Sequence, residues 1–269
     1  MKSVGTHPGR DAGGVLVLMY HGLHANPAAG AGYDPRYSVH PAAFARQMDR
    51  LAATPAALRP VLATSPDSGG VRTVATFDDG DATNATVALP VLQALGLTAI
   101  FFITTDWIGR PGMLTPAQVR ELSVAGMIIG SHGVSHHFFN SLPDAELARE
   151  LQTSRIELSR LTGQPVDVLS LPGGRWDARV MVAAVGAGYR WVFGSRPHLN
   201  PRLQPCADLE APLGRVVVDR SLDDRAFAEL LAWRGGALRR IRARHALLEL
   251  PKRILGDARY DRLRQRVTP

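Results

Sequence analysis

Short apolar runs alternate with longer amphipathic segments along most of this chain. Residues 15–20 form an uninterrupted apolar run, which is typical of a strand buried on both faces. Residues 41–53 carry apolar side chains three and four positions apart, with a proline at the start, which predicts a helix. Alternation of this kind predicts an α/β fold in which crossover helices join parallel strands.

The same alternation continues to about residue 233. Further strands are expected at residues 73–77, 98–103, 127–129, 168–171, 190–193 and 215–218, and further helices at residues 84–95, 115–125, 143–161, 177–187 and 223–233. This pattern predicts a sheet of about seven parallel strands in one domain that spans residues 1–269, with a barrel at roughly residues 15–233. Residues 234–269 are expected to form a basic helical C-terminal extension.

The net charge of +7 is concentrated in that extension. Residues 234–269 hold eleven Lys or Arg against three acidic residues, so the rest of the chain is close to neutral. One interpretation of this basic segment is a surface that attracts anionic lipid or nucleic acid. The other, which we favour, is a helical face that is simply solvated. We expect no nucleic-acid partner, because no nucleic-acid-binding motif occurs in the barrel. Association of the basic helices with a membrane surface is an expectation of the charge alone.

Cysteine content and the first residues bear on the compartment. Only Cys206 is present, so neither an intrachain disulfide nor a zinc site built from cysteines is expected. The first fourteen residues are polar, and the apolar run at 15–20 is too short for a signal peptide or a membrane span. We therefore expect a cytoplasmic protein, peripheral to a membrane if the extension binds one.

Two adjacent carboxylates, Asp78 and Asp79, end the apolar run at 73–77 and precede Gly80. The glycine permits a sharp turn, so that both side chains can serve one pocket. An Asp-Asp-Gly sequence is also an ordinary turn after a strand. His132 and His136 change this balance, because they follow the expected strand at 127–129 and imidazoles four residues apart can converge on one ion. The spacing predicts a metal site with a spare carboxylate, and His137 is an alternative second imidazole.

The motifs resemble those of the polysaccharide deacetylase family, carbohydrate esterase family four, with its NodB-homology domain. Residues 76–80 (TFDDG) and 131–136 (SHGVSH) are similar to its first two motifs, residues 17–21 (VLMYH) to the opening strand of many members, and residues 171–174 (LPGG) to a variant of its third motif. The similarity spans roughly residues 15–227. It implies a distorted, TIM-like (β/α) barrel.

The resemblance also implies roles for individual residues. Asp79, His132 and His136 would hold a divalent metal, usually zinc in the family. Asp78 would be the general base, taking a proton from metal-bound water as it attacks the carbonyl of an N-acetylated sugar, polysaccharide or lipid-linked glycan. Gly173 is the candidate for a backbone N–H that meets the developing oxyanion.

Two positions depart from the family pattern. The third motif commonly opens with an arginine that orients the catalytic Asp, and here Ser170 stands at that place. Arg175, just past the glycines, and Arg215, on the last expected strand, are the candidates to replace it. That last strand also lacks the histidine that many members use as a general acid. His21, at the end of the first strand, is the candidate acid, and a structural histidine is the equally weighted alternative.

Trp176, beside the glycine turn, is a candidate for stacking on a sugar, with core packing as the alternative. His24 lies in a polar loop and is expected at the surface. The metal site read from the residues, together with what the resemblance implies, leads us to expect a zinc-dependent hydrolase of N-acetyl groups. Two alternatives remain, which are hydrolysis of another non-peptide C–N amide bond on the same metal site and an inactive barrel that binds carbohydrate.

Overall fold

The computed structural model describes residues 14–27, 35–54, 71–208, 210–232, 236, 238–243 and 245. Seven strands of this part of the chain form one sheet, in the order β6-β5-β4-β3-β2-β1-β7, and all neighbours are parallel. The strands are β1 (Gly14–Tyr20), β2 (Val71–Phe77), β3 (Ala99–Ile103), β4 (Ile128–Ser131), β5 (Val168–Ser170), β6 (Trp191–Phe193) and β7 (Val216–Val217).

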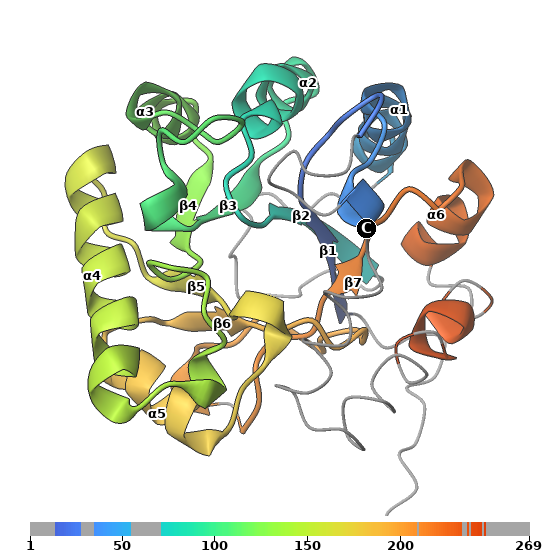
Figure 1. Cartoon of the computed structure of the whole chain (residues 1–269). Coiled ribbons are helices and arrows are strands. Elements are labelled where there is room, and N and C mark those ends of the chain that lie inside the picture. The colour runs from blue at the N-terminus through green and yellow to red at the C-terminus, as the bar shows by residue number, and fades with distance from the viewer. Residues whose placement is uncertain are drawn as a thin grey trace, which may run out of the picture.

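Helices surround the outer face of the curled sheet (Figure 1). They are α1 (Pro41–Ala52), α2 (Leu89–Ala94), α3 (Pro116–Val124), α4 (Asp144–Thr162), α5 (Ala178–Gly186) and α6 (Asp224–Leu231), and a π-helical turn (Asn84–Ala88) leads into α2. Their ends follow ordinary capping chemistry. Thr115 forms a capping box with Gln118 at the start of α3, and α4 ends at Gly163 in the left-handed conformation.

Alternation along each strand divides the buried side chains between two cores. On β1, Leu16 and Leu18 face the helices, whereas Val15 and Val17 belong to a second cluster inside the curl of the sheet. Phe102 of β3 belongs to this inner cluster. Because successive strand residues point to opposite faces, both faces must be apolar, as the uninterrupted run at 15–20 indicates.

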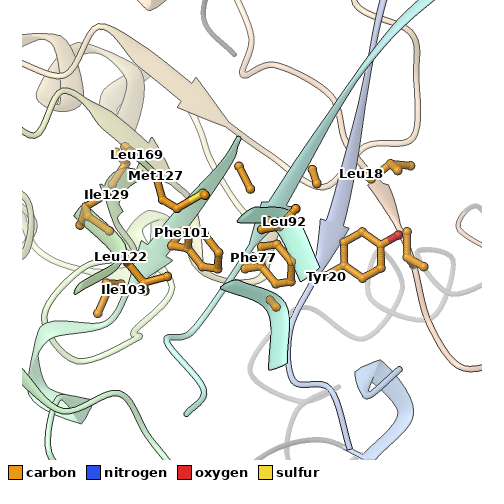
Figure 2. Close-up of a cluster of buried hydrophobic side chains, with 14 of the residues drawn as sticks. Leu18, Tyr20, Phe77, Leu92, Phe101, Ile103, Leu122, Met127, Ile129 and Leu169 are labelled. Carbon is orange, nitrogen blue, oxygen red and sulfur yellow. The ribbon is translucent and has the colours of Figure 1, made fainter. Parts of the chain in front are cut away.

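Aromatic rings fill the outer core between sheet and helices. Phe77 and Phe101 stack with their centroids 4.6 Å apart, and Tyr20 stacks on the other side of Phe77 at 5.4 Å (Figure 2). Leu92 of α2 belongs to the same cluster. This packing holds β1, β2 and β3 in register, which determines where the residues just past their C-terminal ends lie.

The segment before β7 lies between the two edges of the sheet. Leu213 makes an isolated parallel bridge to Phe193 of β6, and three residues later Val216 pairs with Leu18 of β1. Arg215 lies between these two contacts and is almost fully buried, at 1% exposure. The segment therefore brings a cation into the interior of the curled sheet.

The predicted fold class, a distorted α/β barrel of seven parallel strands, is confirmed. The single-domain organisation stays a prediction. Most of the expected basic extension 234–269 falls outside the described residues, although Leu238 and Ile241 pack on the outer core. No helix within the described ranges is both long and apolar enough to cross a membrane.

Candidate functional site

The candidate site lies beyond the carboxyl ends of neighbouring strands. Asp78 and Asp79 follow β2, His132 follows β4, and His21 follows β1. In parallel sheets and barrels this edge collects the polar side chains of several loops. The motifs that lie apart in the sequence are therefore neighbours in the fold.

Asp79, His132 and His136 converge on one point. Their ligand atoms all lie within 4.8 Å of one another, and Asp79 Oδ1 lies 3.4 Å from Nε2 of each imidazole. His132 is buried, whereas Asp79 and His136 are partly exposed. One carboxylate and two imidazoles that open to solvent on one side form a donor set suited to a catalytic divalent metal.

The hydrogen bonding of this triad fits a cation. His132 Nδ1 lies 2.9 Å from the Ser170 carbonyl, which can only accept, so Nδ1 carries the hydrogen. In the neutral ring, Nε2 then presents its lone pair to Asp79 Oδ1, which is buried without a hydrogen-bond partner among the described residues. Two acceptors facing each other require a positive charge between them.

The pKa shifts of Asp79 and His132 also indicate that the triad favours a positive charge. Burial by itself raises the pKa of Asp79, but His132 and His136 outweigh it and hold that pKa well below the usual range. Burial lowers the pKa of His132, whereas Asp78 and Asp79 outweigh this effect and raise it. The carboxylates thus favour a cation here, whether a proton on an imidazole or a metal ion.

The backbone of the triad is strained. Asp79 and His136 have φ angles of 77° and 65°, the positive values that side chains seldom adopt. Gly80 (φ 90°) and Gly133 (φ 81°) lie beside the triad residues in the same left-handed region. Strain of this kind persists where the surrounding contacts over-determine the conformation, which is common at functional sites.

Asp78 points into the interior, where Arg215 binds it through two hydrogen bonds. Arg215 donates from Nη1 to Asp78 Oδ1 at 2.7 Å and from Nη2 to Oδ2 at 2.8 Å. Its other N–H groups donate to the Gly194 carbonyl, the Thr76 hydroxyl and the Ser170 hydroxyl, so all five donors are used. Of the two predicted orienting arginines, Arg215 is therefore the one whose guanidinium lies on the carboxylate.

The surroundings of Asp78 keep it ionised and separate from the triad. Burial raises the pKa of Asp78, but Arg215, then His132 and more weakly His21, outweigh it and lower that pKa. The Ser170 hydroxyl donates to Asp78 Oδ2 at 3.1 Å. That oxygen lies 3.9 Å from His132 Nε2, so the carboxylate stands beside the triad without being one of its members.

His21 lies at the rim of the same site. Its ring stacks on Tyr37 with centroids 4.9 Å apart, and its carbonyl accepts a hydrogen bond from Asn84. Its Nδ1 is buried without a partner among the described residues. The ring is therefore held by stacking and by its backbone, and one nitrogen is left without a bond in the interior.

The other predicted site residues lie around the β5 loop. Gly173 is exposed at φ 62°, and an added Cβ there would lie 2.6 Å from the Phe138 ring, so only glycine fits. The Arg175 guanidinium lies 3.9 Å from the centre of the same ring. Trp176 is partly buried and packs on the outer core, in line with the alternative weighed for it. His137 is exposed with Nδ1 against the Ser135 hydroxyl, and the triad uses His136 instead.

Two features of the site escaped the sequence analysis. Trp107, just past β3, lies against His136 with ring centroids 4.9 Å apart. Glu150 of α4 contacts the loop between the two imidazoles. His24, expected at the surface, is partly exposed, and its Nε2 lies 2.9 Å from the buried Asp81 carboxylate. Of these residues, only Trp107 could have been found from the sequence, because it lies shortly after the carboxyl end of an expected strand.

Comparison with known proteins agrees with this geometry. Residues 67–192 match the family model described as "Polysaccharide deacetylase". The chain is 31% identical over 152 residues to YxkH of Bacillus subtilis (strain 168), a protein assigned provisionally to the polysaccharide deacetylases. That alignment covers 56% of this chain and 53% of YxkH, so the chain spans about half the length of this relative.

Solved structures extend the likeness to most of the fold. IcaB from Ammonifex degensii superposes with a TM-score of 0.65 at 25% identity, over 82% of this chain and 96% of IcaB. A polysaccharide deacetylase from Bacillus cereus superposes with a TM-score of 0.68 at 25% identity, over 81% of this chain and 69% of that protein.

Proposed function

Because the protein belongs to the polysaccharide deacetylase family, we propose that it is a metal-dependent hydrolase that removes N-acetyl groups from an N-acetylated sugar, polysaccharide or lipid-linked glycan. The observation that carries this proposal is the pairing of a triad fit for a cation with a buried, ionised carboxylate at its edge. A protein that only binds carbohydrate has no use for such a carboxylate.

Asp79, His132 and His136 would hold the ion, most simply Zn²⁺, whose catalytic sites use three protein ligands and leave a position open. When bound, such an ion supplies a Lewis acid that polarises a carbonyl and lowers the pKa of a water molecule. The remaining chemistry belongs to the side chains and backbone around it.

Asp78 accepts the proton of the attacking water. Arg215 holds its two oxygens in a fixed plane and keeps the group ionised, so the base is ready near neutral pH. Arg215 lowers the pKa of Asp78 and so makes it a weaker base, but it also fixes the orientation of the carboxylate. The N–H of Gly173, at the exposed β5 loop, donates to the carbonyl oxygen as negative charge develops on it.

The leaving amine needs a proton, and His21 is the group that we assign to supply it. We expect His21→Asn to lower kcat about a hundredfold, because a positioned acid contributes on the order of 10²- to 10⁴-fold. Zn²⁺ affinity should stay unchanged, since His21 is outside the triad. A variant that kept full turnover across the pH range would remove this role.

The proposed function is tested with N-acetylglucosamine oligomers of increasing length, by following acetate release. We expect release with Zn²⁺ present, loss of release after exhaustive chelation, and recovery when the ion is returned. Release from a simple amide but from none of the sugars would favour hydrolysis of another C–N bond. Binding of the oligomers without any acetate release would favour the inactive carbohydrate-binding barrel.

A further inference from the structure

Glu150 reaches from α4 to the loop that carries both imidazoles of the triad. Its side chain is buried, with 3% of the residue exposed. Oε2 accepts hydrogen bonds from the backbone N–H groups of Val134 (2.6 Å) and Ser135 (3.1 Å), and Oε1 accepts one from the Ser135 hydroxyl. These two residues lie between His132 and His136, so one carboxylate holds the middle of the loop that links the two imidazoles.

The loop is built around this carboxylate. A Cβ on Gly133 would lie 2.9 Å from Glu150 Oε2 and 3.0 Å from the Phe139 ring, so the backbone approaches Glu150 as closely as glycine allows. Past the end of β4 the backbone N–H groups of the loop no longer donate to a neighbouring strand. They therefore need another hydrogen-bond acceptor in place of a strand carbonyl. Glu150 supplies that acceptor, and His136 follows directly at a positive φ.

Other contacts fix the position of Glu150 relative to the sheet. Ser154, one turn further along α4, lies 2.7 Å from the hydroxyl of Ser131, the last residue of β4. The Ser131 hydroxyl in turn accepts from the Gly133 N–H at 3.0 Å. The helix that carries Glu150 and the strand that leads to His132 are therefore connected directly by hydrogen bonds.

The charge of Glu150 points to the same role. The partners that the described residues give this carboxylate are two amide groups and one hydroxyl, all of them uncharged. A buried carboxylate held only by dipoles favours positive charge nearby. His132 and His136, two of the three triad residues, lie at the two ends of the loop that Glu150 binds, so this charge favours a cation at the triad in addition to the effect of geometry.

We propose that Glu150 is a positioning residue that holds the 132–136 loop in the conformation in which the imidazoles meet Asp79, and that it thereby sets the affinity of the triad for a divalent metal. The proposal rests on the proposed function, because it requires a metal at the triad. Glu150 acts through the backbone, since its hydrogen bonds go to Val134 and Ser135 and none goes to a triad side chain.

The test compares the full-length wild-type protein with Glu150→Gln and with Glu157→Gln, an exposed glutamate on the same helix. Zn²⁺ affinity is measured by titration calorimetry, and the Co²⁺ absorption spectrum reports the coordination geometry. We expect Glu150→Gln to weaken Zn²⁺ binding about 10- to 100-fold, as for other residues that orient metal ligands, and to alter the Co²⁺ bands. Glu157→Gln should match the wild type in both.

The melting temperature of the metal-free proteins reports a general loss of stability. The Co²⁺ spectrum reports the coordination geometry, so the two measurements together separate a destabilised protein from one whose metal site is displaced. Ser135→Ala, which removes one of the three hydrogen bonds, serves where Glu150→Gln does not fold, and should weaken binding about threefold to tenfold. Wild-type affinity in Glu150→Gln, or in Ser135→Ala if that variant alone folds, would overturn this proposal only. A wild-type protein that bound no Zn²⁺ would overturn the proposed function with it.

Discussion

Asp78→Asn is expected to lower kcat for acetate release by about 10²- to 10⁴-fold, because an amide of the same shape cannot accept the proton of the attacking water. Zn²⁺ affinity should change little, since Asp78 is not one of the three residues whose ligand atoms converge. The measurements are steady-state kinetics on an N-acetylglucosamine oligomer and metal titration of the same preparation.

The adjacent carboxylate provides the matched control for this prediction. Asp79→Asn makes the same chemical change one residue later, and it should abolish tight metal binding, because Asp79 Oδ1 faces both imidazoles. The two variants therefore separate the base from the ligand. Weak metal binding by Asp78→Asn together with tight binding by Asp79→Asn would reverse the two assignments, and full turnover by Asp78→Asn would eliminate the general base.

Arg215→Met is expected to lower the free energy of unfolding by about 3–5 kcal/mol, the usual cost of removing one partner from a buried ion pair. Arg215 and Asp78 are 1% and 3% exposed, so water cannot replace the lost guanidinium. Turnover should fall as well, because the carboxylate loses the two hydrogen bonds that fix its plane. Urea unfolding and steady-state kinetics measure the two effects.

Arg46→Met is the matched control, because Arg46 and Asp224 form an ion pair whose side chains are 57% and 48% exposed. Its removal should cost less than about 1 kcal/mol. The double variant Arg215→Met with Asp78→Asn should recover part of the stability that Arg215→Met loses, since no unpaired charge remains in the interior. A loss for Arg215→Met no larger than that of Arg46→Met would contradict the inferred ion pair.

The strands are where prediction from the sequence came closest. The expected strand at 98–103 is β3 (Ala99–Ile103), and the expected strand at 15–20 is β1 (Gly14–Tyr20). Apolar runs and their breaks are local properties, and a parallel strand buried on both faces leaves the clearest mark of this kind. The bounds of short strands were less accurate, because the expected 215–218 is only Val216–Val217 in the sheet and the expected 127–129 is Ile128–Ser131.

The site could be foreseen in part for a related reason. Asp79 and His132 each follow a strand closely, and the carboxyl ends of parallel strands share one edge, so strand order alone brings them close. The choice of Arg215 over Arg175 could not be foreseen. It depends on how the segment between β6 and β7 crosses the interior, which packing decides rather than spacing.

By itself the sequence determined the succession of strands and helices, the edge at which the polar motifs gather, and the residue types able to hold an ion and move a proton. Tertiary structure alone decided which side chains support them: Arg215 on Asp78, Glu150 on the 132–136 loop, and Trp107 and Tyr37 beside His136 and His21. Hydrophobic periodicity is set by neighbours in the chain. The partner of a buried charge is set by which distant segment the packed core brings within hydrogen-bonding distance, and a linear pattern does not record that.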